Sequence, residues 1–232
     1  MARLKHKLTQ PPQPPVRGVK AATFHLLLDT AMEMIKLEGH VPSVAEVAAR
    51  SKVSRATAYR YFPSRGALVT AVVDSSLGPV RRFVSSQADG RARVLELFAK
   101  TFPRFKEFEP QMRAAVQLAL ERAGLLDEEP YRRGHRVALL EHALAPLAPA
   151  LPAPLRDRLH RALSVVYGIE PYIVLKDIWG LADREVERIA LWMAGALIDA
   201  ALRDAALPGA PPRAPARPRR ASVADATSAR GE

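Results

Sequence analysis

The chain of 232 residues contains no cysteine. This absence excludes disulfide bonds, thiolate nucleophiles and cysteine-ligated zinc, and it is typical of proteins that work in a reducing compartment. Long uncharged apolar runs are also missing: the best candidate, residues 189–198, falls well short of the ~18 residues that a membrane span needs. The N-terminal segment is basic but lacks the apolar stretch of a secretory signal. We therefore expect a cytoplasmic protein that does not associate with membranes.

Sequence signatures of catalysis are missing as well. No glycine-rich phosphate loop, H-E-x-x-H motif, nucleophile elbow or paired-carboxylate setting occurs. The histidines show no metal-ligand pattern; His135 and His142 lie two helical turns apart, but nothing else in the sequence supports ligation. These absences favour a binding protein over an enzyme and predict no catalytic residue, no metal and no cofactor.

The formal net charge of +11 is concentrated at the two ends of the chain. Residues 1–20 contain five basic residues, four prolines and no acid, and residues 208–232 contain five arginines against two acids. Both segments are poor in large apolar residues, so we expect a disordered basic arm and a disordered Pro/Arg/Ala tail. Basic ends of this kind suit contact with phosphates, and they also serve simply to keep a protein soluble.

Between these ends, apolar residues recur with helical rather than strand periodicity, and Leu and Ala outweigh β-branched residues. The pattern predicts an all-α fold. A three-helix head and a linking helix occupy residues 21–78, and a helical bundle occupies residues 79–207, with the boundary at the Gly78-Pro79 pair. The expected helices cover residues 23–38, 43–51, 54–62, 65–76, 80–88, 91–103, 108–123, 128–147, 153–179 and 183–206.

Residues 42–62 have the layout of two short helices joined by a tight turn. Ser43, followed three residues later by Glu46, forms a capping-box pair, and Ser54 is placed to cap the next helix. On a helix that turns 100° per residue, Ala58 and Phe62 face inward. The opposite side of that helix and its edges carry Arg55, Ala56, Thr57, Tyr59 and Arg60.

This outer side has the residue types that read DNA. Arginine bonds bidentately to guanine, the methyl group of Thr or Ala meets the thymine methyl, and hydroxyls hold phosphates. The helix N-terminus at Ser54 adds a preference for anions. No acid occurs in residues 54–62, whereas an ordinary surface helix presents Glu beside Lys. The alternative is that the tyrosines fill gaps in the core and the arginines are merely solvated.

The order VAARSKVSRATAYRYFPSRGAL resembles the DNA-binding domain of the TetR family of bacterial transcriptional repressors, over roughly residues 21–76. The resemblance implies base contacts from Arg55, Ala56, Thr57 and Arg60. It implies contacts to the DNA backbone from Ser43, Tyr59, Tyr61 and Arg65.

One departure from the family pattern is Lys52, where the family usually has Gly in the turn. A left-handed conformation at a non-Gly residue costs roughly 1 kcal/mol, and the lysine adds a positive charge near the DNA.

The resemblance also implies how such a protein works. A homodimer would occupy a palindromic operator as a repressor, and a small hydrophobic or aromatic effector in the C-terminal domain would release it. In similar proteins the last two helices pair with their twins in the dimer. Small and apolar residues that would allow close approach there are Ala194, Leu197, Ala200 and Ala201.

A ligand cavity between head and dimer interface is a further expectation from the family. The residues expected to line it supply aromatic and soft apolar surface with a few polar groups, although most such stripes are simply core: Phe98, Phe102, Phe105, Phe108, Met112, Tyr131, His135 and Tyr167.

Glu170 is included with this set because a carboxylate among apolar neighbours needs a partner. That partner could be an arginine across the dimer or a cationic ligand, with a structural pairing favoured. The following residue, Pro171, is expected to kink the helix.

Two other functions remain open from the sequence. The same head would suit an activator or a ligand-independent regulator of transcription. In a different class, the chain could be a helical protein–protein adaptor in which the motif is coincidental.

Overall fold

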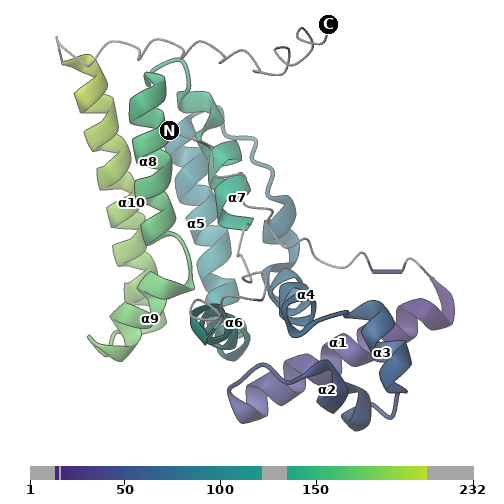
Figure 1. Ribbon diagram of the computed structural model, residues 1–232. Coiled ribbons are helices and arrows are strands. Elements are labelled where there is room, and N and C mark those ends of the chain that lie inside the picture. The colour runs from purple at the N-terminus through teal and green to yellow at the C-terminus, as the bar shows by residue number, and fades with distance from the viewer. Residues whose placement is uncertain (1–13, 16, 122–134, 208–232) are drawn as a thin grey trace, which may run out of the picture.

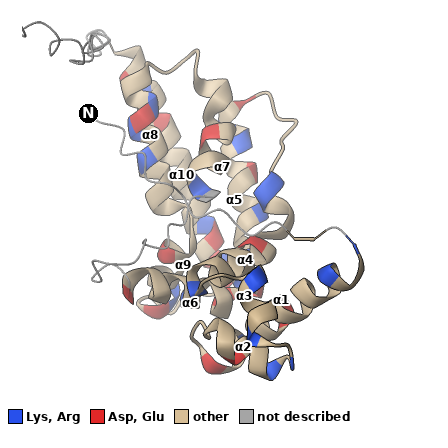
Figure 2. Cartoon of the chain, turned by 45° about the vertical axis from the view of Figure 1, so that its right-hand side comes forward, with Lys and Arg blue, Asp and Glu red and all other residues tan. Residues whose placement is uncertain are grey.

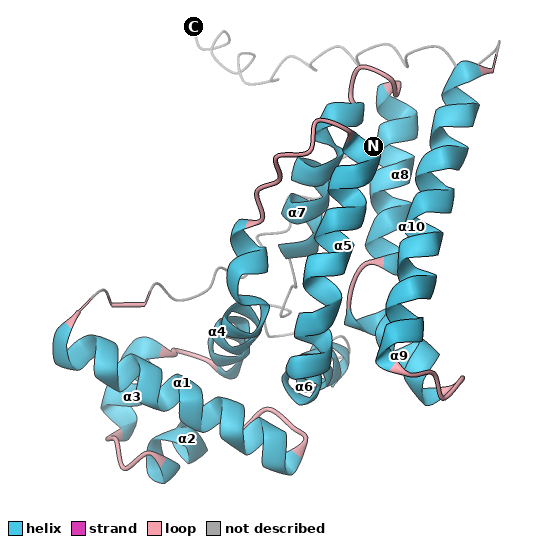
Figure 3. Ribbon diagram, turned by 180° about the vertical axis from the view of Figure 1, so that it is seen from behind, coloured by secondary structure: helices cyan, strands magenta, loops and turns pink. Residues whose placement is uncertain are grey.

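The computed structural model describes residues 14–15, 17–121 and 135–207, and every regular element in these ranges is helical (Figure 1, Figure 3). The prediction of an all-α protein with a helix-turn-helix head and a helical second part is confirmed. The predicted tail and most of the predicted arm lie outside the described residues. Within the described part, no helix combines the length and apolarity that crossing a membrane requires.

The head and its connection to the rest of the chain consist of α1 Gly18–Glu38, α2 Val44–Arg50, α3 Arg55–Tyr61 and α4 Arg65–Leu77. The body follows with a 3-10 turn, η1 Gly78–Arg82, and then α5 Gly90–Glu107, α6 Glu109–Glu121, α7 His135–Leu144, η3 Ala145–Leu147, α8 Ala153–Val166, α9 Ile169–Asp177 and α10 Asp183–Ala206.

The head packs around one apolar stripe of α1. Leu27, Ala31 and Ile35 recur at helical spacing and are fully buried. The Phe24 ring lies 5.0 Å from that of Phe62, at the end of α3. Helix α1 begins at Gly18, earlier than expected from the sequence, and ends where Gly39 adopts a left-handed φ of 76°.

The body is a bundle in which α5 and α8 both pack on α10. Helix α10 lies at the edge of the body farthest from the head (Figure 1). The predicted helix over residues 80–88 is wrong. Only the short η1 turn forms, with Pro79 in its first turn, and a non-helical segment continues until Asp89 caps α5.

The predicted single helix over residues 153–179 is also wrong, because the chain breaks between α8 and α9. The break lies at Gly168, whose φ of 146° and ψ of −175° suit only glycine. Pro171 falls in the first turn of α9, where a backbone N–H has no intrahelical partner to lose. The expected kink at Pro171 is therefore replaced by a break before it.

Helix α4 connects the two parts of the molecule because it packs on α1 of the head and on α6 of the body. Leu68, Val69 and Val72 on α4 are fully buried. Helix α6 also contacts α1 directly: the buried Gln111 side chain donates from Nε2 to the Met32 carbonyl oxygen at 3.0 Å. A shift of α4 or α6 would therefore be transmitted to the head.

Candidate nucleic-acid interface and internal pocket

The start of α2 is fixed by the predicted capping box. The Ser43 backbone N–H donates to Glu46 Oε2 at 2.6 Å, and the Glu46 N–H donates to Ser43 Oγ at 3.2 Å. Hydrogen bonds from the Ser43 side chain and from the Ser43 backbone N–H to the Glu46 carboxylate lower the pKa of Glu46, because they favour its ionised form. The Ser43 hydroxyl thus stands at the first turn of α2, half-buried, where helix N-termini attract phosphate.

The turn between α2 and α3 places Lys52 in the left-handed region, with φ 55°. It is held by two backbone hydrogen bonds, from Lys52 N–H to the Ala49 carbonyl at 3.2 Å and from Val53 N–H to the Ala48 carbonyl at 3.0 Å. The turn therefore forms despite the missing glycine, and the exposed lysine side chain extends from it.

Helix α3 begins at Ser54, whose Oγ accepts from the Thr57 N–H at 3.2 Å. Ala58 and Phe62 are buried, at 0% and 1% exposure, so α3 packs with the face that the sequence predicts. The other side faces solvent and presents Arg55, Ala56, Tyr59 and Arg60, with Thr57 half-buried at its edge.

Charge is arranged unevenly between this face and the body. Within the described ranges, neither Arg55 nor Arg60 makes an ion pair, and the Arg60 guanidinium lies 5.6 Å from the Tyr61 ring centroid. On α8, by contrast, Arg161 lies 3.8 Å from Asp157, and over the body basic and acidic segments are mixed (Figure 2). The outer face of α3 is thus a small basic surface with hydroxyl groups and no neutralising acid.

Tyr61 and Arg65 have partners within the fold that the sequence did not predict. Tyr61 is half-buried, with its ring centroid 6.1 Å from that of Phe24. Arg65 donates from Nε to the Val41 carbonyl at 2.8 Å, and its Nη1 lies 3.4 Å from Glu121 Oε2 on α6. Arg65 therefore ties the head to the body, and its role as a DNA contact stays a prediction.

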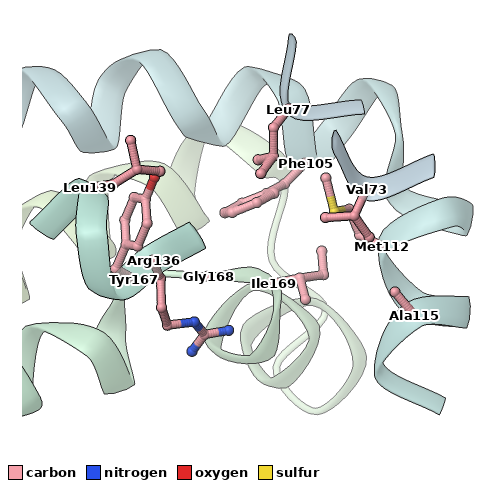
Figure 4. A pocket seen from close by; sticks show the side chains of 10 residues that line it. All are labelled: Val73, Leu77, Phe105, Met112, Ala115, Arg136, Leu139, Tyr167, Gly168 and Ile169. Carbon is pink, nitrogen blue, oxygen red and sulfur yellow. The ribbon is translucent and has the colours of Figure 1, made fainter. Parts of the chain in front are cut away.

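A second feature is a partly open cavity of about 60 Å³ between α4 and the body. Its lining comes from α4, α5, α6, α7 and the α8–α9 break (Figure 4): Val73, Leu77, Phe105, Met112, Ala115, Arg136, Leu139, Tyr167, Gly168 and Ile169. Apart from Arg136 and the Tyr167 hydroxyl, these residues offer only apolar side chains or backbone.

The residues that the sequence assigned to a pocket divide into several groups. Phe105, Met112 and Tyr167 line the cavity. Phe98 and Phe102 do not line it; they are buried in the core, with ring centroids 6.1 Å apart. Phe108 does not line it either. The centroid of its ring lies 4.4 Å from the Arg104 guanidinium carbon.

Two further residues of that set cannot be placed in the same way. Tyr131 lies outside the described residues, and His135 is described only as the first residue of α7. As ligand contacts, all members of the set remain predictions.

Glu170 pairs with an arginine of its own protomer, whereas the sequence analysis expected an arginine across the dimer or a cationic ligand. Arg136 Nη2 lies 2.7 Å from Glu170 Oε1 and 2.5 Å from Oε2, while Nη1 donates to the Ser164 carbonyl at 2.9 Å. Sequence reasoning missed Arg136, because nothing local relates it to a residue 34 positions away.

The Tyr167 hydroxyl is paired with Thr101 Oγ1 at 2.8 Å. Burial raises the pKa of Tyr167 to about 12, so it stays a neutral hydroxyl at physiological pH.

The residues expected at a dimer interface do not share one face of α10. Ala194 and Ala201 are buried in the protomer, on the same stripe as Ala190 and Ile198, and so cannot meet a second copy without unpacking the core. Leu197 and Ala200 are half-buried. The outer face of α10 instead exposes Trp192, at 72%, and Ala196; on α8, Val165 is 71% exposed.

Comparison with known protein families gives a match to one region of the chain. Residues 27–72, which run from α1 into α4, match the profile of the family described as bacterial regulatory proteins, tetR family. No curated protein and no solved structure matches the chain. The match covers the capped turn and the solvent-facing helix described above.

Proposed function

We propose that this chain, a TetR-family DNA-binding transcriptional regulator with an N-terminal helix-turn-helix domain, acts as a homodimeric repressor. The dimer would occupy a palindromic operator until a small apolar effector enters the partly open cavity and releases it. The observation that carries the proposal is the outer face of α3, where basic and hydroxyl side chains face solvent without an acid.

The chemistry of that face assigns a role to each of its side chains. Arg55 and Arg60 reach guanine edges in the major groove, Ala56 and Thr57 contact thymine methyl groups, and Tyr59 holds the backbone. Ser54 and Ser43 stand at helix N-termini, where phosphate is favoured, and Lys52 adds charge nearby. One short recognition helix gives limited affinity, so a second copy is needed to read the other half-site.

The proposed dimer uses the outer face of α8 and α10. Trp192 of α10 and Val165 of α8 are large apolar side chains at more than two-thirds exposure, and Leu197 and Ala200 of α10 are half-buried. Pairing with a second copy would remove these exposed side chains from water. Because this face lies on the far side of the body from the head (Figure 1), pairing there leaves both copies of α3 free.

Effector release follows from the contacts of the cavity. Its walls include Val73 and Leu77 of α4 and Met112 of α6, and both helices pack on α1 of the head. A ligand that prefers the cavity in a shifted arrangement of α4 and α6 would change the spacing of the two heads. Coupling of this kind typically amounts to about 1–3 kcal/mol.

The test is a fluorescence-anisotropy titration of duplexes, using the DNA upstream of its own gene and a pool of random sequence from which binders are selected. We expect a selected duplex with two inverted half-sites about one helical turn apart. Its affinity should fall steeply between about 50 and 200 mM salt. A protein that selects no duplex, or binds all sequences alike, would contradict the proposal and favour the adaptor function.

The dimer is tested separately by analytical ultracentrifugation. Trp192→Glu places a charge on the exposed face of α10 and should shift the protein to monomer with weaker operator binding. Glu187→Gln, elsewhere on the same helix, serves as the control and should leave the dimer intact. A monomeric wild type would contradict this part of the proposal.

A further inference from the structure

A groove of about 380 Å³ lies where α1 of the head meets the end of α4 and the η1 turn. It shares no lining residue with the cavity described above. Ala71 and Ser75 of α4 line the groove, whereas Val73, between them in the chain, lines the cavity. Residues two positions apart on a helix point about 200° apart, so the two sites lie on roughly opposite sides of α4.

The rim of the groove is shaped by the turn at Gly78, which follows α4. Its φ of 53° and ψ of −125° form a conformation that favours glycine. In the segment that follows, Val80 and Phe83 are buried, at 4% and 7% exposure, and so anchor η1 to the core. Arg81 and Arg82 lie between these two anchors, and both line the groove. Their backbone positions are therefore fixed by the fold.

The two arginines of this rim differ in their partners. Arg81 forms an ion pair with Asp74 of α4. Arg82 is exposed and makes no ion pair with any residue in the described ranges. Burial and, after it, the charge of Arg82 lower the pKa of Arg81, because both disfavour its charged form. The rim thus carries one cation, Arg82, that no acid of the described chain neutralises.

The floor of the groove is apolar. Phe24 and Leu28 lie one turn apart on α1 and are buried, at 3% and 5% exposure. Ala71 of α4 and Pro79 of η1 extend this surface. The exposed ring of His25 adds a nitrogen that can donate a hydrogen bond at the edge. An apolar floor below a single unneutralised cation suits a molecule with an apolar body and one negative charge.

We propose that this groove binds a small amphipathic anion, whose apolar body covers the floor and whose anionic group pairs with Arg82. The volume lies within the 300–1,000 Å³ of ligand pockets. The Arg81–Asp74 pair stays in place when the anion binds, and a cation of the same shape would be repelled by Arg82. The bound molecule would contact the head through α1 and the body through η1, and so restrain one against the other. This site is independent of the effector proposed for the cavity.

The test is isothermal titration of the full-length protein with two matched sets of probes: octanoate, octanol and octylamine, then naphthylacetate, naphthylethanol and naphthylethylamine. We expect each acid to bind about threefold more tightly than its alcohol and about tenfold more tightly than its amine, because an ion pair with an exposed guanidinium contributes modestly. The preference should shrink at about 0.5 M salt. Equal binding of acid and alcohol, tighter binding of the amine, or no binding of any acid would overturn the proposal.

Three variants locate the charge and the floor. Arg82→Gln should remove the preference for the acid and leave binding of the alcohol in place. Arg184→Gln is the matched control, because Arg184 is exposed on α10 and also makes no ion pair within the described part; this variant should bind acids as the wild type does. Ser75→Trp places a large side chain at an exposed position of the groove and should weaken acid and alcohol alike. Acid binding that is unchanged in Arg82→Gln or in Ser75→Trp would contradict the proposal.

Hydrogen–deuterium exchange with saturating octanoate distinguishes the groove from the cavity. We expect slower exchange in peptides covering residues 24–28 and 71–82, and little change in peptides covering residues 136–139 and 167–169, which line the cavity. Protection confined to residues 136–139 and 167–169 would assign the acid to the cavity and overturn the proposal. Because this readout needs no substitution, it decides the matter even if a variant fails to fold.

Discussion

Arginine side chains have different surroundings in the head and in the body. On α3, Arg55 and Arg60 are exposed and make no ion pair with any part of the chain that the structure describes. In the body, Arg113 forms two hydrogen bonds with Asp177, at 2.6 and 2.7 Å, and Arg136 holds Glu170. Paired arginines fix helices to one another, whereas unpaired arginines on one face contribute little to folding and remain available to a polyanion.

The largest expected effect comes from the side of α3 that faces away from solvent. Phe62→Ala removes a ring that is 1% exposed, and should lower the free energy of unfolding by about 3–5 kcal/mol. DNA binding should be lost together with the fold of the head. Urea denaturation followed by circular dichroism measures the change.

Tyr59→Ala is the matched variant on the solvent side of α3, where the ring is 45% exposed. It should change stability by no more than about 0.5 kcal/mol while weakening DNA binding. Equal destabilisation by the two variants would mean that α3 does not have an inner and an outer face.

The next effect is on binding alone. Arg60→Ala should weaken the preferred duplex by about 1–3 kcal/mol and relax base preference at one position of each half-site, with unfolding unchanged. Arg91→Ala in the body breaks an exposed pair with Asp199, 3.1 Å apart, and should leave DNA affinity unaltered. Anisotropy titrations of both variants compare head and body directly. Similar DNA affinities of Arg60→Ala and Arg91→Ala would mean that the head does not bind DNA in preference to the body.

Removal of a carboxylate charge in the body, that of Asp183, should instead change the free energy of unfolding and the dependence of that free energy on pH. Asp183 accepts from the Tyr172 hydroxyl at 2.6 Å and from Lys176 Nζ at 2.9 Å, and these bonds lower the pKa of Asp183. A lowered pKa means that stabilisation is present above the ordinary value, about 3.9, and is lost as the pH falls through the folded-state value.

Asp183→Asn should therefore cost about 1–2 kcal/mol at pH 7, and the difference from wild type should narrow below about pH 4. Unfolding curves at a series of pH values measure this, with DNA affinity as the control. A constant difference at all pH values would show that the carboxylate charge is not what stabilises the contact.

The smallest effect is expected at the turn before α3. Lys52→Gly should raise the free energy of unfolding by about 0.5–1 kcal/mol, because glycine adopts a φ of 55° without strain. It should also weaken every duplex alike and reduce the salt slope by about one unit. Lys52→Arg retains the charge and should keep the wild-type slope. A slope that is unchanged in Lys52→Gly would place the lysine away from the DNA.

The sequence predicted those features that depend on near neighbours in the chain. The caps at Ser43 and Ser54 are determined within three residues, and the phase of α3 follows from its period and from the apolar residues Ala58 and Phe62. The break at Gly168 was missed because Pro171, three residues later, gave the stronger signal, although the fold uses the conformational freedom of the glycine.

Contacts between distant segments could not be predicted in the same way. Arg65 with Glu121 and Arg136 with Glu170 join helices 56 and 34 positions apart, and only packing brings them together. For the same reason the sequence could not distinguish the inward stripe of α10 from its outer face: small residues such as Ala194 suit both a core and an interface. The exposed fraction of each side chain distinguishes a core residue from a surface residue, and this quantity cannot be derived from the sequence alone.

Hydrogen–deuterium exchange of the wild-type protein, with and without its selected duplex, tests most directly that the outer face of α3 binds DNA. The account predicts slower exchange on DNA binding in peptides covering residues 43–62, and little change in peptides from α8 and α10. Protection confined to α8 and α10, with exchange in residues 43–62 unaltered by bound DNA, would contradict it.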